Sequence, residues 1–363
     1  MPELPPPIVV LLTPPGRGAI ATLRIEGPRA VELVESLWQA RAGRPLRAFG
    51  CERQALGVFG DNGEEVLVRV CSEDAVEIHC HGGLAAVALI EQSLVAAGCR
   101  AVAWQEWIAA TEADSFVAEV RMALASARTE RTAVILLDQL QGALQKAMDE
   151  IRRTIERGDK SAAQQQIESL LARAPLGKHL VRPWSVVLAG RPNVGKSSLM
   201  NALAGHRRAV VHDTPGTTRD AVTQMTAIDG WPVELCDTAG LRAANDELEV
   251  EGIQRARQRL SAADLVLLVS DLSSPWSEED QRLVDEWPAA LIVHNKCDLP
   301  LAGEKRPAGP CVSAQEGTGI DGLLKEISRW LVPDPPASGA AVPFTVNQIL
   351  MIERLADELL MPT

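Results

Sequence analysis

The spacing of apolar residues divides the chain into three stretches, and the first of them predicts a mixed domain. Short apolar runs at residues 8–12, 21–25, 66–70 and 75–79 alternate with residues 29–38 and 84–97, where apolar positions recur every three or four residues. Short runs are typical of strands, and the longer spacing is typical of helices. We therefore predict an α+β N-terminal domain over residues 1–104.

The second stretch, from about residue 105 to residue 174, has the apolar spacing of helices throughout. One stripe at steps of three or four residues contains Leu137, Leu140, Leu144, Met148, Ile151 and Ile155. A second stripe, after Gly158 and Asp159, contains Ile167, Leu170 and Leu171. Because two such stripes bury their apolar faces by packing on each other, we predict two antiparallel helices.

In the third stretch, from residue 185 onward, strand-like and helix-like segments alternate. The strand candidates are residues 185–190, 233–237, 265–270, 290–295 and 310–313. They are apolar at consecutive positions, which predicts a parallel sheet with helices on both faces. A linker at residues 332–343, rich in Pro, Ala and Gly, then leads to one last helix at about residues 346–360.

This last helix carries apolar residues that suit docking on the helices of the second stretch. They are Ile349, Leu350, Ile352, Leu355 and Leu359. If the helix docks there, the α/β stretch interrupts a helical domain. We therefore predict an α/β domain at residues 181–335, inserted into a helical domain made of residues 105–180 and 344–363.

Composition narrows the classes of protein that remain. The net charge of -12 argues against a generic nucleic-acid binder, because non-specific affinity comes from neutralising phosphates. No apolar run reaches the ~20 residues that a membrane span needs, and residues 1–7 lack the build of a signal peptide. The seven cysteines have no metal-ligand spacing. We expect a cytoplasmic protein with reduced cysteines and no membrane partner.

A phosphate-binding motif, GxxxxGK[ST], lies between the first predicted strand of the α/β stretch and the helix that follows. Its glycines let backbone N–H groups surround phosphates, and the helix N-terminus adds its positive dipole end. Lys196 is placed for the β- and γ-phosphates, and the Ser197 hydroxyl for Mg²⁺. The motif residues predicted to bind the nucleotide are Asn193, Val194, Gly195, Lys196, Ser197 and Ser198.

Two further segments are predicted to sense the γ-phosphate. Asp237 ends the next buried strand and can hold Mg²⁺ through water. After it comes a segment whose backbone N–H can meet the γ-phosphate, made of Thr238, Ala239 and Gly240. Thr217 and Thr218 lie between the two motifs. A threonine there, with Thr218 our candidate, can ligate Mg²⁺ only while the triphosphate is bound, which makes the loop a switch.

Residues 295–298 read Asn-Lys-Cys-Asp and follow the fourth predicted strand. A carboxylate in the plane of the base can accept from both N1–H and the exocyclic amine of guanine, which adenine lacks. Facing adenine, Asp298 would be desolvated and unpaired, at a cost of roughly several kcal/mol. We therefore predict a preference for GTP over ATP through Asn295, Lys296 and Asp298, with Ser313 and Ala314 supporting the base.

The hydrolytic step needs a group that orients water, and the usual one is missing. Many small GTPases have a glutamine where this chain has Leu241, and an aliphatic side chain cannot orient water. We favour Glu249 for this role, although an exposed glutamate at a helix start explains it equally well. Lys196 and Thr218 complete the predicted catalytic set. Asn193 could ligate a monovalent cation.

The motif segments Gly190-Arg-Pro-Asn-Val-Gly-Lys-Ser-Ser198, Pro215-Gly-Thr-Thr-Arg-Asp220 and Asp237-Thr-Ala-Gly-Leu-Arg242 resemble those of the tRNA-modification GTPases called MnmE or TrmE. Ribosome-assembly GTPases such as Era and Der share them. Two N-terminal segments resemble signatures of the first family and decide between the two. They are Thr13-Pro-Pro-Gly-Arg-Gly18 and Val76-Glu-Ile-His-Cys-His-Gly-Gly83.

The resemblance implies a folate-binding N-terminal domain that dimerises, a helical domain and an inserted P-loop GTPase domain. Arg24 and Glu77 match contacts to a folate of the 5-formyl-tetrahydrofolate type. The resemblance also implies a K⁺ ion in hydrolysis, with Glu249 assisting. The residues that match the K⁺ site are Asn193, His212, Thr214 and Thr217. A flavoprotein partner of the MnmG or GidA type and a tRNA with a modified wobble uridine complete the implied function.

The sequence departs from the family's pattern at His212, which replaces a threonine, and at residues 107–117, which lack a folate-contacting lysine. No cysteine follows Cys311, whereas the family ends in a Cys-x-Gly-Lys tail. We therefore expect GTP hydrolysis with poor wobble-uridine modification. The alternatives are a GTP-dependent dimeric switch or scaffold without that chemistry, and a ribosome-assembly GTPase. The last predicts a KH-like GxxG module after the GTPase domain.

Overall fold

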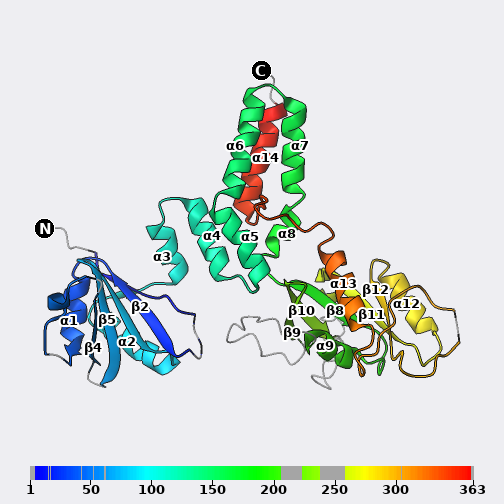
Figure 1. Ribbon diagram of the computed structural model, residues 1–363, viewed down its shortest axis with the longest axis horizontal. Coiled ribbons are helices and arrows are strands. Elements are labelled where there is room, and N and C mark those ends of the chain that lie inside the picture. Colours follow the sequence, from blue (N-terminus) through cyan, green and yellow to red (C-terminus); the bar gives the residue numbers. More distant parts are fainter. Residues whose placement is uncertain are drawn as a thin grey trace. The chain divides into compact units, whose positions relative to one another are not determined.

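The computed structural model describes residues 5–14, 16, 18–41, 43–51, 53–60, 63–205, 223–237, 258–303 and 305–360. Among these, the residues up to Ala118 form one compact unit and those from Glu119 onward form the other. Figure 1 traces the elements of both units in chain order.

A seven-stranded sheet frames the first unit, in the order β3-β4-β5-β6-β2-β1-β7. Its strands are β1 (Ile8–Leu11), β2 (Ile20–Glu26), β3 (Trp38–Ala40), β4 (Gln54–Phe59), β5 (Glu64–Ser72), β6 (Ala75–His81) and β7 (Arg100–Ala101). All pairs are antiparallel except β1 with β7. The apolar runs located β1, β2, β5 and β6. They missed β3 and β7, which are too short to show a period, and β4, which Gly57 interrupts.

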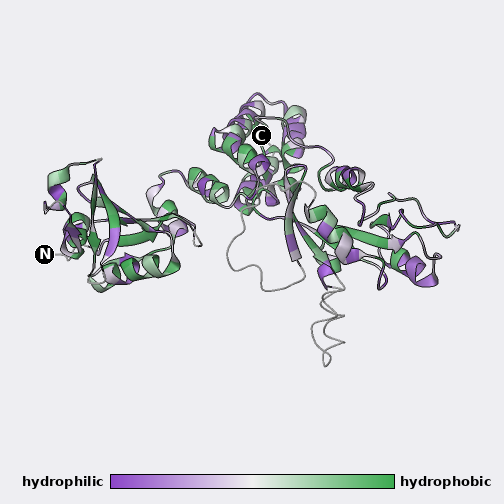
Figure 2. Cartoon of the chain, turned by 60° about the horizontal axis from the view of Figure 1, so that its bottom comes forward, coloured by the Kyte–Doolittle hydropathy of each residue, from purple (hydrophilic) through white to green (hydrophobic). Residues whose placement is uncertain are grey.

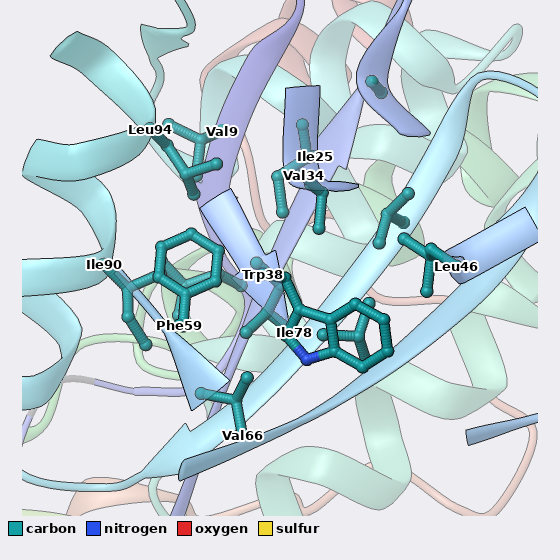
Figure 3. Close-up of a cluster of buried hydrophobic side chains, with 14 of the residues drawn as sticks. Val9, Ile25, Val34, Trp38, Leu46, Phe59, Val66, Ile78, Ile90 and Leu94 are labelled. Carbon is teal, nitrogen blue, oxygen red and sulfur yellow. The ribbon is translucent and has the colours of Figure 1, made fainter. Parts of the chain in front are cut away.

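The helices α1 (Ala30–Leu37) and α2 (Leu84–Ala96) contact each other and the sheet, close to their predicted bounds. Figure 3 shows their buried side chains, among them Val34, Ile90 and Leu94, beside Phe59 and Ile78 of the strands. A 3-10 helix (Leu46–Phe49) and α3 (Trp104–Thr111) complete this unit. Because strand residues alternate between faces, the residues of β2 and β6 that do not enter this core include polar side chains such as Arg24 and Glu77.

Helices open the second unit. They are α4 (Ser115–Ala125), which spans the boundary between the units, α5 (Glu130–Leu140), α6 (Ala143–Glu156), α7 (Lys160–Leu171) and α8 (Ala174–Lys178). The apolar stripe predicted to run from Leu137 to Ile155 is wrong as one helix. Gly142 has φ 89°, which a residue without a Cβ adopts readily, and it separates α5 from α6. Leu137 therefore lies on α5, where it is exposed.

The last helix, α14 (Val346–Leu360), packs on α6 and α7, as predicted. Figure 1 shows it in red beside these two helices in green. Ile352 and Leu355 are buried, whereas Leu350 is exposed, so only part of its apolar set enters the contact. Residues from both ends of this unit's sequence thus form one helical bundle.

A five-stranded sheet lies between the two parts of that bundle in the sequence, in the order β12-β11-β8-β10-β9. Its strands are β8 (Trp184–Ala189), β9 (Thr223–Ile228), β10 (Trp231–Asp237), β11 (Leu265–Asp271) and β12 (Leu291–Asn295). The prediction of a wholly parallel sheet is wrong at β9, an edge strand that pairs antiparallel with β10. The predicted strand at residues 310–313 is also wrong, since only a single bridge joins Cys311 to His294.

Helices accompany this sheet, among them α9 (Lys196–Gly205), α12 (Glu278–Glu286) and α13 (Ile320–Leu331). The helix α12 contacts β11, while α9 and α13 contact each other and β9. Hydrophobic residues, green in Figure 2, run along the strands, and the helices carry both colours. The architecture is a P-loop α/β domain inserted into a helical domain and preceded by an α+β domain. In the described part of the chain, no helix is both long and apolar enough to cross a membrane.

Candidate functional site

The phosphate-binding loop joins the end of β8 to the start of α9, as the motif predicts. Gly190 has φ +145°, and a Cβ there would lie 2.2 Å from the Val269 carbonyl oxygen. Gly195 has φ +91°, and a Cβ there would lie 2.4 Å from the Asn295 side-chain nitrogen. Both positions therefore require glycine, because the loop turns sharply against neighbouring chain.

Lys196 crosses this loop with a buried side chain. Its ammonium donates to the carbonyl oxygens of Gly190 and Arg191, at 2.9 and 2.7 Å. These bonds hold the positive charge at the mouth of a loop that begins α9, where the helix also presents its positive dipole end. The arrangement suits an anion with two or more phosphate groups.

Ser197 and Asp237 meet although 40 residues separate them. The Ser197 hydroxyl donates to Asp237 Oδ2 at 2.5 Å. Parallel pairing of β8 with β10 brings Leu188 opposite Asp237, so the two motifs emerge at the same edge of the sheet. A hydroxyl and a carboxylate oxygen are hard ligands of the kind that Mg²⁺ prefers, so this pair fits the ion.

Asn295 connects the phosphate loop to the segment expected to support the base. Its Nδ2 donates to the Val194 carbonyl at 3.0 Å, and its Oδ1 accepts from the Ala314 N–H at 3.0 Å. The residue is 2% exposed, and its bond to Val194 is buried. Asn295 therefore fixes the spacing between the two loops.

Lys296 makes a second connection, which the motif analysis missed. Its ammonium donates to the Asn193 carbonyl at 2.8 Å and to Asp271 Oδ2 at 2.6 Å. Burial by itself would raise the pKa of the Asp271 carboxyl. Hydrogen bonds from Lys296 and Ser273 outweigh burial, so the pKa lies below its ordinary value. Asp271 was recognisable as an acidic residue at the carboxyl end of a buried strand, opposite Asn295.

Asp298 and Ser313 differ in accessibility. Asp298 is exposed, and its carboxylate makes no hydrogen bond to any residue that the structure describes. Ser313 is fully buried, with its Oγ accepting from the Glu316 N–H and its carbonyl from the Gly317 N–H, at 3.1 and 2.8 Å. Asp298 is thus accessible from solvent, whereas Ser313 shapes the neighbouring turn.

The remaining predicted residues lie outside the described part of the chain. Residues 206–222 contain His212, Thr214, Thr217 and Thr218, and residues 238–257 contain Thr238, Ala239, Gly240 and Glu249. The described residues thus place together the phosphate loop, Asp237 and the base segments. The roles assigned to the two switch segments stay predictions.

A separate polar cluster occupies one face of the seven-stranded sheet. Arg24 of β2 lies opposite Glu77 of β6, and its Nη1 donates to Glu77 Oε1 at 3.1 Å. Arg24 also pairs with Glu26 at 3.0 Å, and Glu26 accepts from the Trp107 indole N–H at 3.0 Å. The structure thus brings together both residues predicted to contact folate.

His79, two residues after Glu77, adds an unsatisfied group to this cluster. Its Nδ1 lies 3.0 Å from the Thr22 hydroxyl. Its Nε2 is buried and has no hydrogen-bond partner among the described residues, with Glu77 Oε2 at 3.9 Å. A buried polar atom without a partner is costly, so the cluster fits a polar ligand that would complete it.

Relatives of the chain extend over the N-terminal region as well as the nucleotide site. Over 375 aligned residues it is 36% identical to the tRNA modification GTPase MnmE of Geobacillus kaustophilus (strain HTA426), covering 88% of this chain and 81% of that protein. The chain belongs to the MnmE family of tRNA modification GTPases. The MnmE of Moorella thermoacetica (strain ATCC 39073 / JCM 9320) is 31% identical over 392 residues, which cover 94% of this chain and 85% of that protein.

Models of two protein families match separate parts of this MnmE-family chain. Residues 7–107 match the GTP-binding protein TrmE N-terminus, and residues 185–296 match the 50S ribosome-binding GTPase family. Among solved structures, Era in complex with MgGDPNP and nucleotides 1506–1542 of 16S ribosomal RNA matches at 27% identity and a TM-score of 0.32, over 42% of this chain and 58% of that one. As an MnmE-family member, the chain is a GTP-hydrolysing enzyme.

Proposed function

We propose that this chain couples GTP hydrolysis to modification of the wobble uridine of tRNA. Alignment with a tRNA modification GTPase over 88% of the chain carries the proposal, together with the match of residues 7–107 to the TrmE N-terminus. The proposal divides the chain into residues 1–104 for folate and dimerisation, residues 105–180 and 344–363 for the helical domain, and residues 181–335 for GTP. The nucleotide motifs alone would support only the last of these.

In this proposal the loop around Lys196 binds the phosphates of GTP. The Lys196 ammonium and the backbone N–H groups at the start of α9 neutralise the β- and γ-phosphate oxygens. Ser197, Asp237 through water, and Thr218 would hold Mg²⁺, which supplies further charge neutralisation when bound. The hydroxyl–carboxylate contact at 2.5 Å supports the Ser197 and Asp237 assignments. Gly195, Ser198 and the segment after Asp237, made of Thr238, Ala239 and Gly240, complete the set around the phosphates.

The base would lie against residues 295–298 and the turn at residues 313–314. The exposed Asp298 carboxylate accepts from guanine N1–H and from the exocyclic amine, and the Lys296 stem and the Ala314 N–H border the base. The bond from the Ala314 N–H to Asn295 Oδ1 supports this assignment, because it holds the two base-contacting segments together, and the bond from Asn295 to Val194 ties them to the phosphate loop. Comparing affinities for GTP and ATP tests it, and equal affinities would contradict it.

Hydrolysis would depend on Glu249 to orient water and on a K⁺ ion held by Asn193, with His212, Thr214 and Thr217 completing its site. Support comes from the exposed amide of Asn193 and from Leu241, which cannot orient water. K⁺, when bound, would offset charge between the β- and γ-phosphates. Turnover several-fold faster in potassium than in sodium buffer is expected, and equal turnover would contradict the K⁺ assignment.

The N-terminal sheet would bind a folate of the 5-formyl-tetrahydrofolate type through Arg24 and Glu77. The unsatisfied Nε2 of His79 on the same face supports a polar ligand there. We also propose that this domain forms a homodimer and that a flavoprotein of the MnmG or GidA type is the partner in the tRNA reaction. Light scattering that gave a monomer at micromolar concentration, with and without nucleotide, would contradict the dimer.

Mass spectrometry of tRNA nucleosides tests the whole proposal. The chain, the flavoprotein partner, the folate, GTP and unmodified tRNA are combined, and the modified wobble uridine is measured. We expect weak modification, because residues 107–117 lack the folate-contacting lysine, and no modification when the Lys196→Ala variant replaces the chain. GTP turnover without any modified uridine would instead favour a GTP-dependent switch or scaffold.

A further inference from the structure

Arg191, the second residue of the phosphate loop, forms an ion pair with a helix that contains none of the nucleotide motifs. Its Nε lies 2.9 Å from Oδ1 of Asp280, in the first turn of α12. The Asp280 side chain is 4% exposed and that of Arg191 is 24% exposed. A buried carboxylate of this kind needs a cation or strong donors to offset the loss of water.

The other oxygen of Asp280 is fixed by the start of its own helix. Ser277 donates to Oδ2 from its backbone N–H at 3.0 Å and from its hydroxyl at 2.7 Å, and its hydroxyl accepts from the Asp280 N–H at 3.2 Å. This reciprocal capping box holds the carboxylate in one orientation. Oδ1 is therefore left directed at Arg191 and at no other group of α12.

Arg191 is also hydrogen-bonded to the Lys196 ammonium in the phosphate loop. The Arg191 carbonyl accepts from Lys196 Nζ at 2.7 Å, so one residue is bound to α12 by its side chain and to Lys196 by its backbone. Asp280, Arg191 and Lys196 thus form one continuous chain of hydrogen bonds. A shift of the Arg191 backbone would move an acceptor of the Lys196 ammonium.

We propose that Asp280 and Arg191 are positioning residues for GTP binding, and that their ion pair holds the phosphate loop in the conformation that accepts phosphates. The inference rests on the proposed binding of GTP phosphates by this loop. The loop surrounds the phosphates that GTP and GDP share. Loss of the ion pair therefore weakens the binding of GTP and of GDP by the same factor. The loss lies in Kd and KM, and kcat at saturating GTP changes less than about threefold.

The test compares Arg191→Gln, Asp280→Asn and the double variant in the full chain, at a temperature where circular dichroism shows each to be folded. A fluorescent GDP analogue gives Kd, and GTP turnover gives kcat and KM. Each single variant should raise Kd and KM about tenfold, within the usual range of coupling between residues in contact. The double variant should also raise Kd and KM by only about tenfold, because both changes break the same ion pair.

Two control variants separate positioning from helix stability. Arg282→Gln removes an exposed arginine that pairs with Glu278 on the same helix, at 3.5 Å. Ser277→Ala removes the cap hydroxyl, but the Ser277 backbone N–H still donates to Asp280 Oδ2, so the carboxylate keeps its orientation toward Arg191 while the melting temperature falls. Both controls should keep Kd within about twofold of the parent chain.

Three outcomes would overturn the inference. One is an unchanged Kd in Asp280→Asn while Arg191→Gln loses affinity, since Arg191 would then bind phosphate directly. Another is a double variant whose fold-increase in Kd equals the product of the increases in the two single variants, since the two residues would then act independently. A third is a matching loss in Ser277→Ala. If Lys196→Ala also keeps its affinity, the assignment of the loop to the phosphates has failed, and the inference fails with it.

Discussion

The two sheets of this molecule assemble their polar residues in different ways. In the five-stranded sheet, the polar residues follow the carboxyl ends of parallel strands, as Asp237 and Asp271 do at the ends of β10 and β11. In the seven-stranded sheet, Arg24 and Glu77 lie in the middle of antiparallel strands, opposite each other on one face. A site built at strand ends uses loops, which are continuous in sequence. A site built on a sheet face uses the pairing of strands.

This difference has a consequence for what each site tolerates. The loop site depends on a few residues in strained or buried positions, such as Gly190 and Asn295. The sheet-face site depends on side chains that keep partial contact with water, since Arg24 is 23% and Glu77 15% exposed. We therefore expect larger losses from single substitutions in the first site than in the second.

The largest effect is expected from Lys196→Ala. The change removes the cation that donates to two carbonyls of the phosphate loop, and with it the charge that would face the β- and γ-phosphates. We expect GTP turnover to fall by about a hundredfold or more. Binding of folate to the N-terminal sheet, measured by calorimetry in the same preparation, serves as the control and should not change. Loss of both activities would mean that the two sheets do not act as separate sites.

A somewhat smaller effect is expected from Asp298→Asn, which changes the base that is accepted. An amide cannot accept from both guanine donors, so affinity for GTP should fall by about a hundredfold while affinity for xanthosine triphosphate rises. Competition of the two nucleotides against a fluorescent GDP analogue measures the shift. An unchanged order of affinities would remove Asp298 from the base site.

Next is the pH dependence contributed by Asp271, whose pKa is lowered by Lys296 and Ser273 against the opposing effect of burial. A carboxyl with a pKa lower in the folded chain than in the unfolded chain contributes stability above the unfolded value of about 3.9. That contribution to stability is lost as the pH falls through the pKa that Asp271 has in the folded chain. Asp271→Asn should therefore cost about 2 kcal/mol of unfolding free energy near pH 7 and progressively less below pH ~4.

Urea unfolding of the two chains at several pH values checks this prediction. A difference between Asp271→Asn and the parent chain that stays constant from pH 7 to the acid limit would contradict it. Arg152→Gln provides a matched control, because Arg152 forms an exposed pair with Asp149 at 2.9 Å and should leave the pH dependence unchanged.

The smallest effect on stability is expected from Arg24→Ala on the face of the other sheet. Its partly exposed pairs with Glu26 and Glu77 should contribute only about 0.5 kcal/mol after screening by water. Binding of the folate should nevertheless weaken by about tenfold. Calorimetric titration measures the second effect, and Arg29→Ala, which breaks an exposed pair with Glu32, is the control. Equal folate affinity in Arg24→Ala and Arg29→Ala would remove Arg24 from the folate site.

The order of the secondary structure was largely predictable, and the errors have physical causes. Buried parallel strands such as β8 and β11 are apolar at consecutive positions, so the sequence locates them. The edge strand β9 is half exposed and has no such run, and it was missed. The stripe from Leu137 to Ile155 was wrongly assigned to one helix. Its apolar residues keep a spacing of three or four across α5 and α6, because the turn at Gly142 has little effect on that spacing.

The sequence by itself determined the phosphate loop, the Asn-Lys-Cys-Asp segment and the nucleotide class, because each of these is a continuous segment whose chemistry depends on residue type and local backbone. Only the tertiary structure decided which distant residues meet. The pairs Arg24–Glu77, Lys296–Asp271 and Arg191–Asp280 join residues 53, 25 and 89 positions apart. Strand register and helix packing create these pairs, and charged residues are too common along the chain for their partners to be recognised from residue type alone.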